Sequence, residues 1–272
     1  MKKIFLTIVS MAVCLTVQGE NILKKDIPYL DADGNADMEE RCKVLVSYPG
    51  DGRNLPVLVF FHGGGLKRGE RHIPEKLRQP DLVTVGAGYR VYPTVSVAQL
   101  LDDSAAAVAW TVAHAGEFGG DPENIYLSGS SGGAYIALML ALDKHYLAKY
   151  GIDADKLSGV ISMAGQVITH QAAREEKHIN RKQPTIDEMA PLYHIRPDAP
   201  PILLLAGDTR SDLLCRRQEN AYMYAMMKHI GHKDITFYHF DGVSHNNMGI
   251  PSYPVTLNWI RDHEKARGQT RK

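Results

Sequence analysis

Hydrophobic positions along the chain alternate between short β-rich runs and longer stretches with helical spacing. Residues 56–61 (PVLVFF) form a continuous apolar run, which is typical of a strand buried on both faces. Further β-rich runs cover residues 43–46, 82–89, 125–128, 160–164, 202–206 and 235–240. Apolar residues recur at helical spacing over 97–115, 133–147 and 214–230, and Asp121-Pro122 indicates a turn.

This alternation predicts an α/β fold with a mainly parallel central sheet and helices on both faces. In such sheets, functional groups gather at the carboxyl ends of the strands. Residues 166–200 interrupt the pattern with a polar segment, and an insertion of that length is typical of a cap or a binding element. We therefore expect one domain over residues 20–272, with a short cap or binding insertion at 166–200.

The start of the chain follows a different pattern. Two lysines precede an uncharged, mostly apolar run over residues 4–17, which ends shortly before Gly19. That order is typical of a secretory signal peptide, and the run is shorter than a membrane-spanning helix. We expect a signal peptide over 1–19, cleavage after Gly19, a secreted or periplasmic protein, and no membrane span once the signal is removed. A lipid anchor at Cys14 fits poorly, because Val13 is bulky where a small residue is expected.

Composition and charge narrow the classes of partner. Hydrophobic residues make up 44% of the 272 residues, which suits one large core. The 31 Lys and Arg residues balance 31 Asp and Glu residues, so no basic surface is expected to hold a nucleic acid. Cys42 and Cys215 lack metal-ligand spacing, and the sequence leaves open whether they pair. We expect neither a metal nor a cofactor.

A G-x-S-x-G sequence covers residues 129–133, directly after one predicted strand and directly before a predicted helix. A nucleophile elbow needs this context, because the serine sits on a sharp turn where only small neighbours fit. By this spacing, Ser131 is the nucleophile and Ser130 is not.

A second glycine-rich segment, His62-Gly63-Gly64-Gly65, follows the buried strand at 56–61. Successive glycines let backbone N–H groups approach a ligand and hold the oxyanion of a tetrahedral intermediate. We assign the donors to Gly64 and Gly65, with Gly132 as the third, and interpret His62 as a residue that organises the loop.

The general base is expected to be a histidine after the last strand. His245 fits best, because it lies in a turn-rich loop after the strand at 235–240. His239 falls inside that strand, and His263 falls in the terminal helix, so both are interpreted as structural or solvated.

The acid of the triad should follow the strand at 202–206, where Asp208 and Asp212 both lie. Asp212 is far enough along the loop to reach back to the histidine, and it is also placed to cap the next helix. We favour Asp212, with Asp208 as the alternative acid and Glu219 third. The order Ser131, Asp212, His245 is the order of α/β-hydrolases.

These motifs resemble the α/β-hydrolase superfamily, and more narrowly its hormone-sensitive-lipase-like esterases and exported carbohydrate esterases. The segment at 62–65, Gly88-Tyr89-Arg90-Val91-Tyr92-Pro93, and Phe118-Gly119-Gly120-Asp121-Pro122 carry the resemblance. It covers about residues 40 to 262. Asp212 is followed by two leucines rather than Pro-Leu, and Ser130 stands where an acidic residue is common.

The resemblance implies an α/β-hydrolase fold and hydrolysis of carboxylic esters by a metal-free triad. We expect a serine esterase that forms an acyl-enzyme and acts on a small-molecule or carbohydrate ester, with short-chain or acetyl esters, including those on plant-polysaccharide sugars, as the favoured substrates. An amidase, formamidase or peptidase on the same triad is the alternative, and a non-catalytic binding protein is a third hypothesis.

Overall fold

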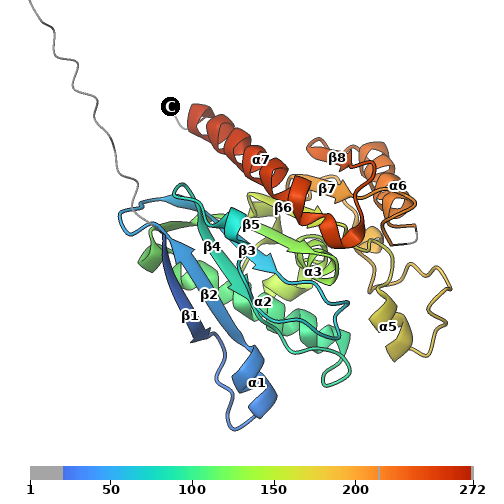
Figure 1. Ribbon diagram of the computed structural model, residues 1–272, viewed down its shortest axis with the longest axis horizontal. Coiled ribbons are helices and arrows are strands. Elements are labelled where there is room, and N and C mark those ends of the chain that lie inside the picture. Colours follow the sequence, from blue (N-terminus) through green and yellow to red (C-terminus); the bar gives the residue numbers. More distant parts are fainter. Residues whose placement is uncertain (1–20, 214, 271–272) are drawn as a thin grey trace, which may run out of the picture.

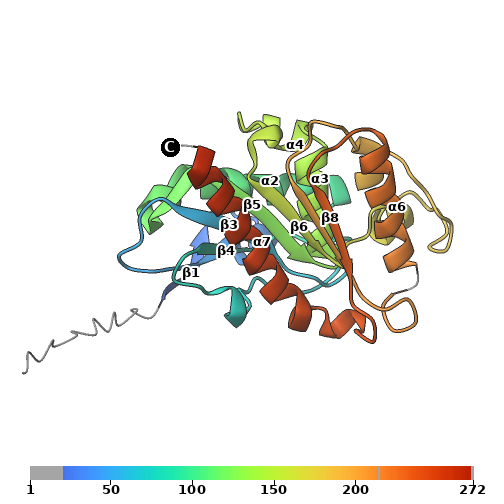
Figure 2. The ribbon, with the colours of Figure 1, turned by 90° about the horizontal axis from the view of Figure 1, so that it is seen from above.

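The computed structural model describes residues 21–213 and 215–270, and in it a single sheet is covered by helices on both faces (Figures 1 and 2). The strands are β1 (Ile22–Pro28), β2 (Lys43–Tyr48), β3 (Leu55–Phe61), β4 (Val83–Ala87), β5 (Gly120–Ser130), β6 (Gly159–Met163), β7 (Ile202–Ala206) and β8 (Ile235–His239). Their order is β1-β2-β4-β3-β5-β6-β7-β8, and all neighbours from β4 to β8 are parallel. The predicted mainly parallel α/β-hydrolase fold is confirmed. The expected signal peptide at 1–19 lies outside the described residues.

Helices connect most of the parallel strands. They are α1 (Ala36–Arg41), α2 (Val97–His114), α3 (Gly132–Leu142), α4 (His145–Ala148), α5 (Gln171–Glu176), α6 (Arg216–His229) and α7 (Gly249–Thr270). Short 3-10 turns are η1 (Glu75–Leu77), η2 (Ala115–Phe118), η3 (Ala154–Lys156), η4 (Pro191–His194) and η5 (His245–Asn247). Within the part of the chain that the structure describes, no helix combines the length and apolar character needed to cross a membrane.

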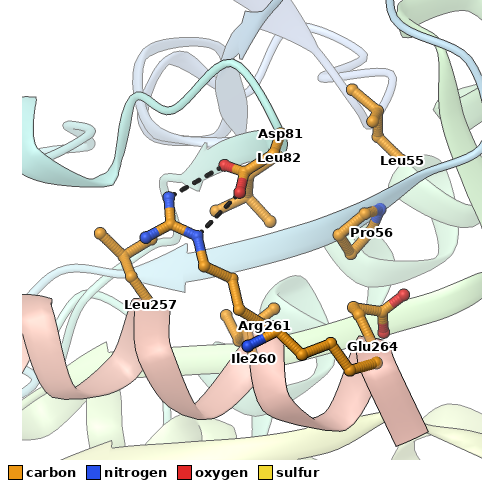
Figure 3. A pocket seen from close by; sticks show the side chains of 9 residues that line it. Leu55, Pro56, Asp81, Leu82, Leu257, Ile260, Arg261 and Glu264 are labelled. Atoms are coloured by element: carbon orange, nitrogen blue, oxygen red, sulfur yellow. Dashed lines mark hydrogen bonds and ion pairs between the residues drawn. The ribbon is translucent and has the colours of Figure 1, made fainter. Parts of the chain in front are cut away.

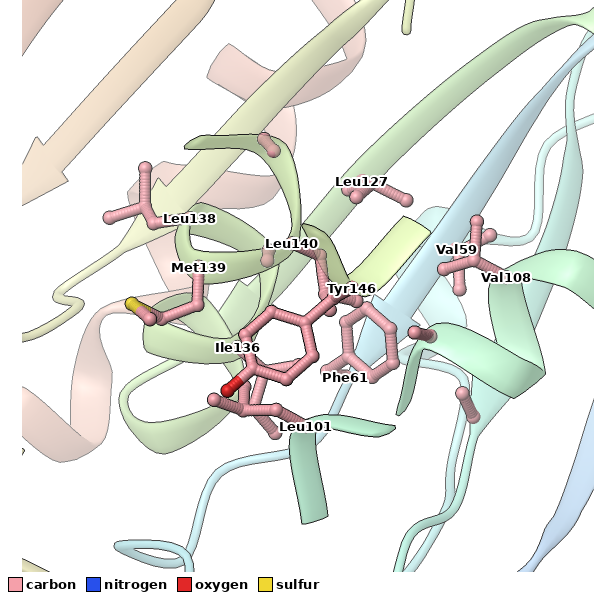
Figure 4. Close-up of a cluster of buried hydrophobic side chains, with 14 of the residues drawn as sticks. Val59, Phe61, Leu101, Val108, Leu127, Ile136, Leu138, Met139, Leu140 and Tyr146 are labelled. Atoms are coloured by element: carbon pink, nitrogen blue, oxygen red, sulfur yellow. The ribbon is translucent and has the colours of Figure 1, made fainter. Parts of the chain in front are cut away.

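The apolar run in β3 explains how the core divides into two layers. Val57, Val59 and Phe61 face a cluster that includes α2, α3 and α6, part of which is shown in Figure 4. Leu58 and Phe60 face a second cluster that includes α7. Successive side chains of a strand point to opposite faces, so a strand covered on both sides must be apolar throughout.

The amino-terminal elements were absent from the sequence prediction. β1 pairs antiparallel with β2 at the edge of the sheet, and each of its residues is exposed or partly exposed. α1 has no buried residue. Neither element therefore carries an apolar pattern that the sequence could reveal.

The structure has two helices where the sequence predicted one over 133–147, because α3 ends at Leu142 and α4 begins at His145. The Asp143 carboxylate accepts a hydrogen bond from the His145 N–H at 3.3 Å, which offers the backbone an alternative to the helix.

The turn predicted at Asp121-Pro122 lies inside the bounds of β5. Pairing with β3 is irregular there, since the register shifts between the pairs Leu55↔Gly120 and Val57↔Ile125. The Asp121 carboxylate accepts a hydrogen bond from the Glu123 N–H at 2.9 Å. The residues thus form an irregularity at the start of a strand rather than a separate turn.

Candidate active site

Ser131 lies at the join between β5 and α3, at the carboxyl end of the parallel strands. Its backbone has φ 55° and ψ −114°, a strained conformation for a residue with a side chain. Its N–H donates to the Met163 carbonyl of β6 at 2.8 Å, which helps to hold the turn against the sheet. This geometry matches the predicted nucleophile elbow.

Gly129 and Gly133, the two glycines of the G-x-S-x-G motif, lie so close to other backbone atoms that no side chain would fit. A Cβ built on Gly129 would lie 2.3 Å from the carbonyl carbon of Gly133, and one on Gly133 would lie 2.1 Å from the Phe61 oxygen. Real Cβ atoms do not approach backbone atoms so closely. Each glycine therefore lets the strand turn into the helix.

The structure brings Ser131, His245 and Asp212 into one hydrogen-bonded chain. Nε2 of His245 lies 2.8 Å from Oγ of Ser131, and Nδ1 lies 2.7 Å from Oδ1 of Asp212. An ionised carboxylate only accepts hydrogen bonds, so Nδ1 carries the imidazole proton and donates it. Nε2 is then left without a proton and accepts the hydrogen bond of the Ser131 hydroxyl, as a general base must.

The Asp212 side chain is fully buried, with an exposed fraction of 0%. Burial raises the pKa of its carboxyl, but hydrogen bonds from His245, Leu213 and Gly207 outweigh burial and hold the pKa below its usual value. Asp212 therefore stays ionised, and both of its oxygens are fixed by donors.

Asp208 occupies a different place in the same loop. Its carboxylate accepts hydrogen bonds from the N–H groups of Gly242 at 2.8 Å and Arg210 at 2.7 Å. Its own N–H donates to the Val243 carbonyl at 2.9 Å. Asp208 thus ties the loop after β7 to the loop that carries His245, and the structure does not place it against the imidazole.

The other candidates also lie apart from the triad. The Glu219 carboxylate lies 3.6 Å from the Arg216 guanidinium, and burial raises its pKa. His239 lies in β8, and His263 of α7 pairs with Asp234 at 3.1 Å. Cys42 is buried and Cys215 is exposed, and the two are not joined.

The glycine-rich loop after β3 lies directly against the elbow. A Cβ built on Gly63 would lie 3.5 Å from Cβ of Ser131. One built on Gly132 would lie 3.3 Å from the backbone nitrogen of Gly65. The loop and the start of α3 therefore present their backbones to one another beside the serine hydroxyl.

The backbone N–H groups assigned to the oxyanion are available. Among the described residues, none accepts a hydrogen bond from the N–H of Gly64, Gly65 or Gly132. As the first residue of α3, Gly132 has no intrahelical acceptor. Gly64 has φ 121°, and a Cβ on it would lie 1.9 Å from the Arg68 oxygen, so this conformation requires glycine.

Two residues behind the loop fix its shape. The Tyr89 hydroxyl donates to the His62 carbonyl at 2.7 Å, and the two rings stack with centroids 4.3 Å apart. Nδ1 of His62 donates to the Gly63 carbonyl at 2.7 Å, and burial lowers the imidazole pKa to about 4, so His62 is neutral. The Tyr92 N–H donates to the Leu66 carbonyl at 2.9 Å. The segment at 88–93 thus supports the glycine-rich loop, a role that the sequence motif alone did not reveal.

A cavity of about 580 Å³ opens in front of Ser131. Its walls are built from the glycine loop, the elbow, the loops that carry Asp212 and His245, and the first residue of α5. The described residues that line it are Gly63, Gly64, Gly65, Lys67, Arg68, Ser130, Ser131, Gln171, Leu213, His245 and Asn246. Lys67, Arg68, Gln171, Leu213 and Asn246 carried no motif that would have identified them in the sequence.

A second cavity, of about 510 Å³, lies at the other end of the parallel strands (Figure 3). It lies between the start of β3 and α7, is mostly apolar, and has the Arg261–Asp81 ion pair at 2.8 Å on its edge. None of its lining residues belongs to the candidate site. Within residues 21–213 and 215–270, no group of three or more His, Cys, Asp or Glu side chains is placed to hold a metal ion.

The sheet and the turn between β5 and α3 define the chain as an α/β-hydrolase-fold protein, with Ser131, His245 and Asp212 joined by hydrogen bonds at the end of the sheet. Residues 46–223 match the BD-FAE family, and the chain belongs to that family. The resemblance drawn from the sequence motifs is therefore confirmed.

Comparisons with individual proteins agree with this class. Phenmedipham hydrolase of Pseudarthrobacter oxydans is 36% identical over 135 residues, which cover 45% of this chain and 27% of that protein. Carboxylesterase NlhH of Mycobacterium tuberculosis is 37% identical over 93 residues, which cover 32% of this chain and 29% of that protein. The matched segments thus span less than a third of these relatives. A truncated form of a carbohydrate esterase from gut microbiota has a similar fold, with a TM-score of 0.73 and 14% identity over 92% of this chain and 98% of that one.

Proposed function

We propose that the protein hydrolyses carboxylic esters through an acyl-enzyme on Ser131. The observation that carries the proposal is the chain of hydrogen bonds from Asp212 through His245 to Ser131, at 2.7 and 2.8 Å, beside backbone N–H groups that donate to none of the described residues. The names of the relatives, which include a carboxylesterase and other hydrolases, support the same reaction class.

The reaction follows from these positions. Nε2 of His245 takes the hydroxyl proton while Oγ of Ser131 attacks the carbonyl carbon of the ester. The carbonyl oxygen becomes an oxyanion, which the N–H groups of Gly64, Gly65 and Gly132 hold. The intermediate collapses, His245 gives its proton to the alkoxy oxygen, and the alcohol leaves. Water, deprotonated by His245, then attacks the acyl-enzyme and releases the acid and free Ser131.

We also propose that the acyl group is short, with acetyl esters, including acetylated sugars, as the favoured substrates. Leu213 is the one aliphatic side chain among the described residues that line the cavity. A long acyl chain gains about 0.8 kcal/mol for each CH₂ that it buries, and Leu213 alone among the described lining residues offers an aliphatic side chain for that purpose. The likeness to a carbohydrate esterase supports a sugar ester.

The test is hydrolysis of p-nitrophenyl acetate and p-nitrophenyl octanoate by three proteins. The wild type should hydrolyse the acetate with the higher kcat/KM. Ser131→Ala should reduce kcat by about 10⁴- to 10⁶-fold, as in other serine triads. Ser130→Ala, the neighbouring hydroxyl, is the matched control and should retain most of the activity. Near-normal activity of Ser131→Ala would overturn the nucleophile, and a preference for octanoate would overturn the short acyl group.

A further inference from the structure

The insertion at 166–200 brings the amino-terminal end of α5 to the cavity and anchors it there. His170 caps α5, and its Nδ1 accepts a hydrogen bond from the Ala172 N–H at 3.1 Å. His170 is 3% exposed, and the centroid of its ring lies 5.0 Å from that of the Tyr135 ring in α3. Because the cap is buried against a core helix, the first residue of α5 has a fixed position.

Two further contacts hold the other end of α5. The Glu175 carboxylate pairs with the Lys67 ammonium of the glycine-rich loop at 2.6 Å. The Glu176 carboxylate accepts a hydrogen bond from the Val97 N–H, at the amino end of α2, at 3.0 Å. α5 is thus connected to the oxyanion loop and to the core, so it forms a wall of the site.

Gln171 is the residue of this wall that lines the cavity. Its Oε1 accepts a hydrogen bond from Nη2 of Arg181 at 3.2 Å. A guanidinium has donors only, so the atom that faces Arg181 must be the amide oxygen. The amide nitrogen therefore points the other way, and Nε2 lies 3.5 Å from a Cβ built on Gly65. The amide nitrogen, which carries two N–H donors, consequently lies beside the oxyanion loop in a residue that lines the cavity.

Nearby side chains add to this donor-rich wall. Arg68 also lines the cavity, as does Lys67, whose ammonium is paired with Glu175, and no Asp or Glu is among the described residues that line it. A wall of donors matches a substrate that offers oxygen acceptors. The oxyanion of the reaction already has three backbone donors, so the Gln171 amide is free for a different oxygen.

We propose that Gln171 is a substrate-binding residue that donates a hydrogen bond to an oxygen of the ester beyond the scissile group, and that the insertion thereby selects oxygenated esters over alkyl esters. Arg181 is its positioning residue. This inference rests on the proposed ester hydrolysis. The acceptor is an ether or hydroxyl oxygen, on either the alcohol or the acyl side of the ester.

Two pairs of substrates, each differing by one CH₂ replaced by oxygen, test the proposal and distinguish the two sides. Methoxyethyl acetate and butyl acetate form the alcohol pair, and methyl methoxyacetate and methyl butyrate form the acyl pair. For each pair, the ratio of kcat/KM values is compared between the wild type and a variant, which cancels the intrinsic reactivities of the esters. Gln171→Leu removes the donors at similar volume. Gln183→Leu, an exposed glutamine of the same insertion outside the cavity lining, is the matched control.

Gln171→Leu should lower the oxygen-to-alkyl ratio by about 5- to 10-fold in one pair, which identifies the side, and Gln183→Leu should leave both ratios unchanged. Arg181→Ala should lower the same ratio, and should have no further effect in the Gln171→Leu background. An equal loss on both members of each pair, or no loss, would overturn the inference. If the wild type hydrolysed none of the four esters, the proposed function itself would fail.

Discussion

At the scale of single residues, Asp208 and Asp212 share one loop but have different environments. The Asp212 side chain is fully buried and contacts the imidazole of His245, whereas Asp208 is partly exposed and its carboxylate binds backbone N–H groups. Asp212→Asn should therefore lower kcat by about 10³- to 10⁴-fold, because a neutral amide favours the wrong tautomer of the imidazole. Steady-state kinetics on p-nitrophenyl acetate provide the measurement.

Asp208→Asn is the matched comparison, since the same chemical change is made four positions earlier. Its carboxylate only ties two loops together, so we expect a loss of less than about 10-fold. A larger loss in Asp208→Asn than in Asp212→Asn would contradict the assignment of the acid.

Among the site residues, sequence motifs indicated those whose chemistry depends on local spacing. Ser131 and the glycines stand in strings whose strand and helix context was readable, and chain order singled out His245. The sequence favoured Asp212 as the acid but could not exclude Asp208. The direction of a side chain within a loop depends on contacts with the backbone, such as the hydrogen bond that Asp208 accepts from Gly242. The sequence did not identify Gln171, because only the folded chain brings it to the cavity and into a hydrogen bond with Arg181.

At the scale of elements, the join between β5 and α3 depends on a glycine that has no room for a side chain. A Cβ on Gly133 would lie 2.1 Å from the Phe61 oxygen at the end of β3. Gly133→Ala should therefore lower the free energy of unfolding by at least about 2 kcal/mol, because the backbone must shift to admit the methyl group. Urea denaturation gives the measurement.

Gly116→Ala provides the control for the elbow. A Cβ on Gly116 would meet nothing within 4 Å. The free energy of unfolding of Gly116→Ala should equal that of the wild type or exceed it by about 0.4–1 kcal/mol, because alanine lowers the conformational entropy of the unfolded chain. Equal stability of the two variants would show that the elbow tolerates a side chain.

Strands buried on both faces were predictable, whereas β1 and α1, at one edge of the sheet, were not. β3 and β7 are continuous apolar runs, and β6 is interrupted only by the buried Ser162, because each strand is covered on both faces. β1 carries Lys24, Lys25 and Asp26, and its pairing with β2 comes from backbone hydrogen bonds at the sheet edge. A strand held mainly by backbone hydrogen bonds needs no periodic pattern of hydrophobic residues. Such a strand is therefore recognised only when the fold is known.

At the scale of the whole molecule, a buried neutral histidine makes stability depend on pH. Burial, together with the charges of Arg216 and Arg174, lowers the pKa of His170 to about 3. The unfolded chain binds a proton at this residue below about pH 6.5, whereas the folded chain does not. Its contribution to stability is therefore complete above pH 6.5 and is lost as pH falls toward 3, by about 1.4 kcal/mol per pH unit.

His170→Asn tests this pH dependence, because asparagine keeps a capping oxygen but does not titrate. The free energy of unfolding, measured in urea at pH 6, 5 and 4, should fall less steeply than in the wild type by about 1.4 kcal/mol per pH unit. His178→Asn changes an exposed histidine of the same insertion and should retain the wild-type slope. A wild-type slope in His170→Asn would mean that the buried imidazole accepts a proton in the folded protein.

The claim that Ser131 is an activated nucleophile has a direct measurement. The full chain is treated with a fluorophosphonate, its intact mass is recorded, and the modified peptide is sequenced. One adduct per chain on Ser131 is predicted, with labelling absent in Ser131→Ala and preserved in Ser130→Ala. A wild type that does not react, or an adduct on another residue, would contradict the account.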